Sequence, residues 1–236
     1  MTGTDTGSAD SRARRGRRPT LSLEQVVDEA VSLLDARGAS HLTLRRLADN
    51  LDTGVGSLYH YVSGKEELLD RATNEVLGDV LASLSLPDDP FDALEELSMT
   101  FYETMDRHRW LGAYMLRDVT MQPNSMRMFE LFGQQLMGLD LTPMQRFDAV
   151  SSLISFVTGV GAEMRELPPE VTKEHLDQRQ ALHRFAVAWR KLDAEEFPFV
   201  HSVVDVFESH EDEAQFRAGV ELILAGIRVQ AGVSPG

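Results

Sequence analysis

A short run of residues in the first third of the chain has the chemistry of a surface that contacts nucleic acid. Gly56 and Ser57 are small, so a helix that carries them can bring its backbone close to the edges of bases. Tyr59 and His60 follow, with groups that can form hydrogen bonds to phosphates or bases. Lys65 adds a cation at the start of the next predicted helix, where free backbone N–H groups also favour a phosphate.

The elements that must position these residues are short helices. Apolar residues three and four apart predict a first helix from Leu23 to about Leu34, which Gly38 ends. The same spacing predicts a second helix over about 44–51, with Thr43 as its N-cap, and a third over about 55–62. The last two are too short to be stable alone, so they must pack on their neighbours.

A fourth, longer helix completes the predicted unit. Ser63 with Glu66 three residues later has the pattern of a capping box, and the helix should run to about Leu84. Three or four helices that present a short one outward form the helix-turn-helix arrangement of DNA-binding proteins. The simpler alternative is that these residues form only a small helical core.

Three segments in sequence order resemble the DNA-binding domain of the tetracycline-repressor (TetR) family. They are Thr43-Leu-Arg-Arg-Leu-Ala48, Val55-Gly-Ser-Leu-Tyr-His-Tyr-Val62 and Ser63-Gly-Lys-Glu-Glu-Leu-Leu69, within about residues 21–72. The resemblance implies that the helix with Leu58 enters the major groove of double-stranded DNA. It places nearest the bases Val55, Gly56, Ser57 and His60. It places nearest the phosphates Thr43, Arg45, Tyr59, Tyr61 and Lys65.

Residues 1–20 are predicted to be a disordered basic arm. Apolar periodicity is absent there, and the arm contains five arginines: Arg12, Arg14, Arg15, Arg17 and Arg18. The chain carries a net charge of −15, yet residues 1–72 are nearly neutral and residues 73–236 carry most of the negative charge. This asymmetry keeps a nucleic-acid partner open. We expect the arm to contact the minor groove or the phosphates, although arginine runs are often simply solvated.

Residues 73–236 are predicted to form a larger, all-helical ligand-binding and dimerisation domain. Helices about 143–165 and 212–230 are apolar on more than one side and carry small residues. Doubled by a two-fold axis, they would make a four-helix interface, and the resulting homodimer would bind a palindromic operator. The alternative is that both are central helices of a monomer.

The resemblance to the tetracycline-repressor branch extends more weakly into this domain, through Trp110-Leu111-Gly112 and parts of 141–164 and 197–227. In that branch a drug is held with magnesium, and a histidine near 112–122 ligates the metal. The present sequence has no histidine there, so we expect an apolar small-molecule effector without metal or cofactor. Candidate lining residues are Phe101, His108, Trp110, Met115, Met121, Phe129, Phe132 and Phe156, although a single residue of this kind is more often part of a core than a ligand contact.

Composition excludes several other classes. No run approaches 18 apolar residues, no apolar segment follows the arginines, and there is no cysteine. These features predict a cytoplasmic protein without a membrane span, secretory signal or disulfide framework.

An enzyme is the alternative from another class. Asp88, Asp89 and Asp92 have the D-D-x-x-D spacing of helical terpenoid synthases, in which carboxylates hold magnesium. Asp89 as a helix N-cap before Pro90 explains the string equally well. The sequence therefore favours an all-α, non-enzymatic transcriptional repressor. Within that fold, a regulator without an effector, controlled by protein contact, stays open.

Overall fold

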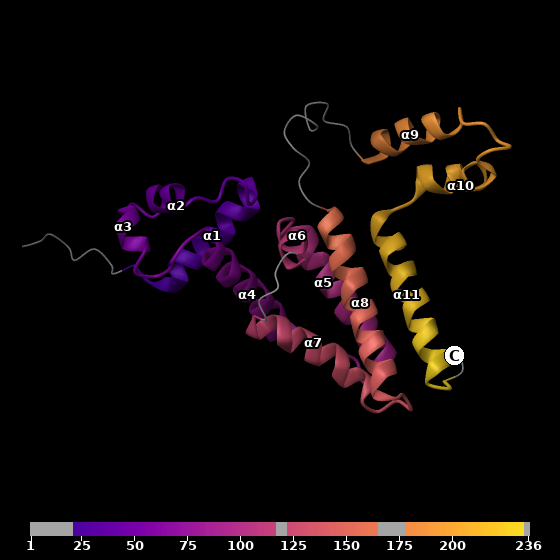
Figure 1. The fold of residues 1–236 in the computed structure, drawn as a ribbon, viewed down its shortest axis with the longest axis horizontal. Coiled ribbons are helices and arrows are strands. Elements are labelled where there is room, and N and C mark those ends of the chain that lie inside the picture. The colour runs from indigo at the N-terminus through magenta and orange to yellow at the C-terminus, as the bar shows by residue number, and fades with distance from the viewer. Residues whose placement is uncertain (1–20, 117–121, 165–177, 234–236) are drawn as a thin grey trace, which may run out of the picture.

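The computed structural model describes residues 21–116, 122–164 and 178–233, in which every regular element is a helix (Figure 1). The helices are Leu23–Arg37 (α1), Leu44–Asn50 (α2), Val55–Leu58 (α3), Lys65–Ser83 (α4), Pro90–Arg107 (α5), Leu111–Met115 (α6), Pro123–Leu136 (α7), Pro143–Glu163 (α8), Gln178–Trp189 (α9), Pro198–Ser209 (α10) and Asp212–Gln230 (α11). The predicted all-α fold is confirmed. None of the described helices combines the length and the apolar character that crossing a membrane requires.

Helices α1–α3 and the start of α4 form a small unit that we call the reader. Leu34, Leu47 and Leu58 are at most 1% exposed and lie in its core. A capping box between Ser22 and Gln25 starts α1, and Gly38 ends it with a positive φ of 72°. Local capping and a few buried leucines therefore define the reader, as the apolar spacing predicts.

Helix α4 connects the reader to the rest of the molecule without a break. The expected capping box of Ser63 and Glu66 is wrong: Gly64 is the N-cap, and no side chain caps the helix. The carboxylate of Glu67, one residue further on, instead accepts a hydrogen bond from the Ser63 backbone N–H at 2.7 Å. The predicted domain boundary after residue 72 falls inside α4.

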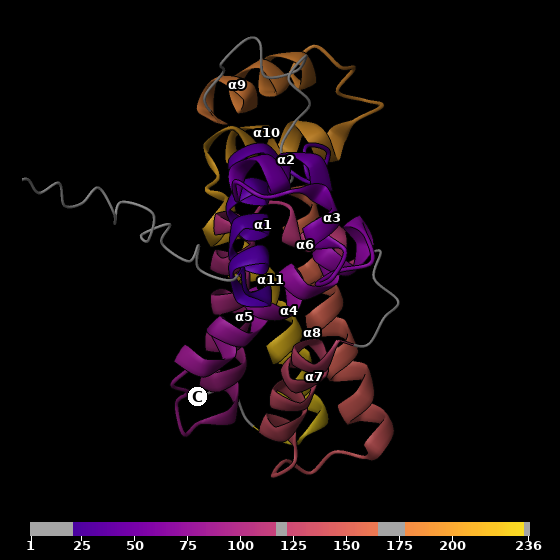
Figure 2. The same cartoon turned by 90° about the vertical axis from the view of Figure 1, so that its left-hand side faces the viewer.

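The second half of α4 and helices α5–α11 form the body. Figures 1 and 2 show α5, α8 and α11 running beside one another, with α7 between α4 and α8. Helix α6 approaches α8 so closely that a Cβ on Gly112 would lie 2.4 Å from the backbone carbon of Gly161. Helices α9 and α10 pack mainly on each other, beyond the start of α11.

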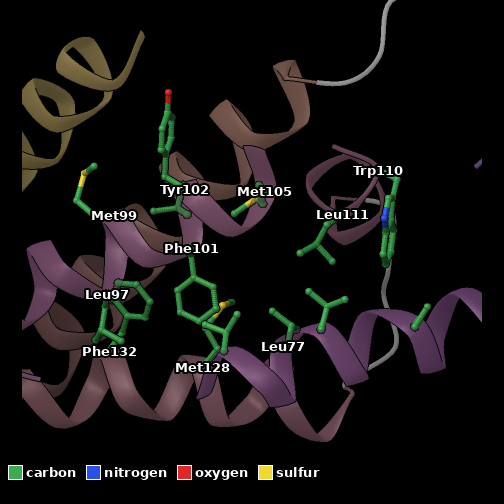
Figure 3. Packing of buried hydrophobic residues seen from close by; sticks show 14 of the residues in the cluster. Leu77, Leu97, Met99, Phe101, Tyr102, Met105, Trp110, Leu111, Met128 and Phe132 are labelled. Atoms are coloured by element: carbon green, nitrogen blue, oxygen red, sulfur yellow. The ribbon is translucent and has the colours of Figure 1, made fainter. Parts of the chain in front are cut away.

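Part of the core of the body lies between α4, α5 and α7 (Figure 3), and the core continues onto α8 and α11. Phe101 on α5 points toward Phe132 and Met128 on α7, and the two phenylalanine rings stack with centroids 6.1 Å apart. Phe101 and Phe132 are 0% and 1% exposed. Burial of its apolar face stabilises α5 on the body. A fully buried phenylalanine contributes about 1.5–3 kcal/mol by transfer from water alone.

Candidate nucleic-acid interface and effector site

A tight turn between α2 and α3 determines how α3, the outward helix, is oriented on the reader. Asp52 occupies the left-handed region with a φ of 46°, which aspartate tolerates better than most residues. The Thr53 N–H then donates to the Ala48 carbonyl at 2.9 Å and closes the turn. Helix α3 itself is shorter than predicted. Its four residues continue as tight turns, in which the Tyr61 N–H donates to the Leu58 carbonyl at 2.9 Å.

The exposed side of α3 carries most of the residues predicted to lie near bases. Gly56, Ser57 and His60 are exposed, while Leu58 between them is fully buried and holds the helix on the reader. Nothing lies within 4 Å of the position that a Cβ on Gly56 would take. Val55 is half-buried and packs against the core, so only part of its side chain faces outward. Figure 2 shows α2 and α3 at the end of the molecule that faces the viewer.

The predicted phosphate contacts differ in how free their polar atoms are. Thr43 and Arg45 are exposed at the start of α2, and the Thr43 hydroxyl oxygen accepts the Arg46 N–H while its own hydrogen remains available. Tyr59 is 59% exposed. Lys65 is exposed and donates one of its three hydrogens to the Ala39 carbonyl at 2.6 Å.

Tyr61 occupies a different environment from these four. It is half-buried, and its hydroxyl donates to the backbone carbonyl of Leu21, immediately before α1. A tyrosine hydroxyl has a single hydrogen to donate. Donation to a phosphate would require this bond to break, so the structure gives Tyr61 a role in joining α1 to the end of the outward helix. The arm, with Arg14, Arg15, Arg17 and Arg18, lies outside the described residues.

Glu67 stabilises the entry to α4 electrostatically. The backbone N–H of Ser63, followed by the guanidinium of Arg71, lowers the pKa of the Glu67 carboxyl to about 2. Arg71 donates to Oε1 of Glu67 through Nε at 2.9 Å and Nη2 at 2.7 Å. The charged carboxylate therefore orders the turn that presents Lys65.

The predicted effector residues do not come together in one place. Phe101 and Phe132 lie in the closed core, and Met115 and Phe129 are half-buried against it. His108 and Trp110 both bond to Asp35 of the reader. Met121 lies outside the described residues. Phe156 is the remaining residue of the predicted set.

Phe156 lines a cavity of about 530 Å³ between α5, α8 and α11. Phe156 stacks on Phe216 with ring centroids 5.3 Å apart, and Phe216 stacks on Tyr102 at 4.4 Å. Val160 and Leu222 add aliphatic surface. Burial, and then the nearby Asp212 carboxylate, raise the pKa of the Tyr102 hydroxyl, which stays protonated at neutral pH. No local spacing pattern could have joined residues 102, 156 and 216.

One of the three carboxylates of the enzyme alternative, that of Asp89, has a structural role. Asp89 is the N-cap of α5, and its Oδ1 accepts the backbone N–H groups of Phe91 at 2.9 Å and Asp92 at 3.1 Å. Pro90 follows at the first helical position, as predicted.

Two regions of the chain match known protein families. Residues 26–72 match the bacterial regulatory proteins of the tetR family, and residues 86–231 match the tetracyclin repressor-like C-terminal domain. The chain is 34% identical over 156 residues to the HTH-type transcriptional repressor DrrR1 of Streptomyces coeruleorubidus, a match that covers 66% of this chain and 57% of DrrR1.

Solved structures agree over most of the chain. The TetR regulator SCO7222 of Streptomyces coelicolor is 31% identical, with a TM-score of 0.75 over 90% of this chain and all of that one. ActR of the same organism, in complex with actinorhodin, is 26% identical with a TM-score of 0.76 over 90% of this chain and 99% of ActR. The helix-turn-helix unit and the helical body of this chain thus match a known pair of domains. The chain therefore belongs to the TetR family of DNA-binding transcriptional regulators.

Proposed function

We propose that the protein is a homodimeric cytoplasmic repressor that binds a palindromic operator and is released from it by an apolar small molecule. The observation that carries the DNA-binding part is the outer side of α3, where small and polar side chains are exposed over a buried Leu58. Gly56, Ser57 and His60 would read base edges, with Val55 contributing apolar contact. Thr43, Arg45, Tyr59 and Lys65, with the arm, would hold the phosphates.

Exposed apolar side chains on α8 and α11 support the homodimer. Phe147 on α8 is 59% exposed, and Leu222 and Val229 on α11 are each 77% exposed. The two helices pack side by side. Apolar patches of this kind mark association surfaces in proteins that are otherwise polar outside. Two copies of this surface would form a four-helix interface and present two readers to a palindrome.

The cavity beside Phe156 supports an apolar effector. Its aromatic row offers flat surfaces for a ring system, and the protonated Tyr102 hydroxyl offers one polar contact. Leu222 lies on the rim and is widely exposed, so a partner subunit on α11 would close the cavity. The related ActR was solved with actinorhodin bound, which makes that compound a reasonable first probe.

The test is operator binding followed by release. Fluorescence anisotropy on the promoter next to the coding sequence should show tighter binding than to random DNA, and His60→Ala should reduce that preference while Asp49→Ala, an exposed change on α2, should not. Light scattering should give twice the chain mass of 26.4 kDa. Absence of any preference for the promoter would reject the DNA-binding proposal.

The effector proposal is tested on the same complex. Actinorhodin and a panel of apolar multi-ring compounds are added with and without a chelator, and at least one should release the DNA in both conditions. Phe156→Leu should weaken release and leave operator affinity unchanged. If release requires a divalent ion, the inference from the missing loop histidine is wrong. If no compound releases the DNA, a regulator controlled by protein contact replaces the effector proposal.

A further inference from the structure

A polar cluster ties α1 of the reader to the corner between α5 and α6 of the body. Oδ1 of Asp35 accepts a hydrogen bond from Nε1 of Trp110 at 2.8 Å. The same oxygen lies 2.8 Å from Nδ1 of His108. The two rings stand edge to face, with centroids 6.3 Å apart. We call these three residues the clasp.

The position of Asp35 is unfavourable without these partners. It lies in the last turn of α1, where the negative end of the helix dipole disfavours a carboxylate. The two donors on the body offset this repulsion, since a hydrogen bond to a charged group is stronger than one between neutral groups. Its partners are well covered: the His108 side chain is 15% exposed and Trp110 is 7% exposed. The clasp is therefore a partly desolvated contact rather than a loose surface pair.

Packing contributes little to how α1 is held against helices α5–α11. Helix α1 packs on α2 and α4, and its contacts with α5–α11 are sparse. A cavity of about 690 Å³ lies beside the clasp, lined by Leu34 and Lys65 of the reader and by Arg109 and Ala113 of the body. Helix α4 has hydrogen bonds of its own to the body. The Tyr114 hydroxyl donates to the Asp70 carboxylate, and Asn124 donates to the side-chain and backbone oxygens of Asn74.

We propose that Asp35 is a positioning residue that fixes the angle of the reader on the body through His108 and Trp110. The consequence for operator binding rests on the proposed function, because two readers must keep a fixed spacing to enter successive major grooves. Trp110 directly precedes α6, and the Gly112–Gly161 approach locks α6 onto α8. A movement of α8 would thus reach α1 through the clasp.

The structural test measures the angle directly. The chain has no cysteine, so Asp49→Cys on α2 and Met137→Cys after α7 place one spin label on the reader and one on the body. Dilution with unlabelled chain restricts the measurement to labels on one molecule. Asp35→Ala should broaden the distance distribution. Asp28→Ala removes another exposed carboxylate of α1 and should leave it unchanged. Asp35→Asn keeps an acceptor for Trp110 and should restore most of the wild-type width.

Two further readouts connect the clasp to its partners and to DNA. The chain has two tryptophans, so the indole N–H signal of Trp110 is assigned with Trp189→Phe and should shift and exchange faster in Asp35→Ala. Operator affinity should fall roughly five- to tenfold in Asp35→Ala, because a less preorganised reader must be ordered on binding, and not in Asp28→Ala. Unchanged distances and an unchanged indole signal would overturn the clasp, whereas a wild-type protein without operator preference would overturn only the proposed function.

Discussion

The reader and the body place their functional side chains in opposite ways. In the reader, the residues predicted to meet DNA lie within one stretch, 43–65, and project from a small core of fully buried leucines. In the body, the aromatic row that lines the cavity comes from positions 102, 156 and 216 on three helices. A surface built from one local motif can be recognised in sequence, whereas a cavity built from distant segments depends on how the helices pack.

Neighbouring residues of α5 show the same contrast within a single helix. Phe101 points into the closed core toward Phe132, while Tyr102 points to the other side of α5, as Figure 3 shows. Tyr102 there stacks on Phe216. Helical geometry turns successive side chains by about 100°, so adjacent aromatic residues can serve two different environments. Residue type alone could not tell which of the two lines a cavity.

The largest effect we expect is on the closed side of α5. Phe101→Ala should lower the free energy of unfolding by about 3–5 kcal/mol, because it removes a fully buried ring and leaves a void against Phe132. Urea unfolding followed by circular dichroism measures the loss. Met126→Ala, at an exposed site on α7, is the control and should stay within about 0.5 kcal/mol of wild type. A loss below about 1 kcal/mol would return Phe101 to the list of effector residues.

Much of the fold follows from signals that act over a few residues. The stop at Gly38, the N-cap at Thr43 and the start of α5 at Asp89 with Pro90 were all predictable, since each depends on neighbours within one turn. The capping box at Ser63 was wrong for a related reason. Glu66 and Glu67 both offer a carboxylate near the helix start, and only the backbone path at Gly64 decides which one reaches Ser63.

The functional roles of single residues were harder to predict than the elements. Tyr61 has the type and place of a phosphate contact, yet its hydroxyl is used by Leu21, about 40 residues away in sequence. His108 and Trp110 have the type of effector contacts, yet both face Asp35 of the reader. In each case a partner distant in sequence claims the polar atom, and no spacing rule contains that partner.

The arm offers a second way to test the contrast, because its arginines add positive charge to the sequence just before the reader. Deletion of residues 1–18 should leave the thermal unfolding midpoint unchanged and weaken binding to operator and random DNA alike. The loss should be greatest at low salt, where the phosphates are least screened. The salt dependence of log K should fall by roughly 0.9 for each arginine that lies on a phosphate. Equal affinity of the full and truncated chains at low salt would show that the arm is only solvated.

Lys65 should have a smaller effect of the same kind. Lys65→Met keeps the aliphatic stem and removes the charge and the bond to Ala39. Binding to operator and random DNA should weaken by the same factor, and the salt slope should fall by about 0.9 per protomer. The matched comparison is Tyr61→Phe, which removes the hydroxyl that donates to the Leu21 carbonyl. This variant should leave the salt slope unchanged. A loss confined to the operator in Lys65→Met would mean that the lysine reads sequence instead.

The smallest expected effect concerns Glu67, which supports the reader surface without touching DNA in this arrangement. Its pKa is about 2 in the folded chain, below an ordinary value of 4.5, so the folded state favours the charged carboxylate. The stabilisation is therefore complete above about pH 4.5 and is lost as the pH falls toward 2. Its side chain is 31% exposed, so solvent screening keeps the contribution below about 1 kcal/mol.

Glu67→Gln separates this charge effect from the hydrogen bond. Glutamine can still accept the Ser63 N–H but does not ionise, so the variant should be slightly less stable than wild type at pH 7. The difference should shrink on acidification and be mostly lost by about pH 2, as measured by urea unfolding at several pH values. A difference that stays constant from pH 7 to pH 2 would assign the role of Glu67 to shape and hydrogen bonding. The charge of Glu67 would then not contribute to the order of the turn that presents Lys65.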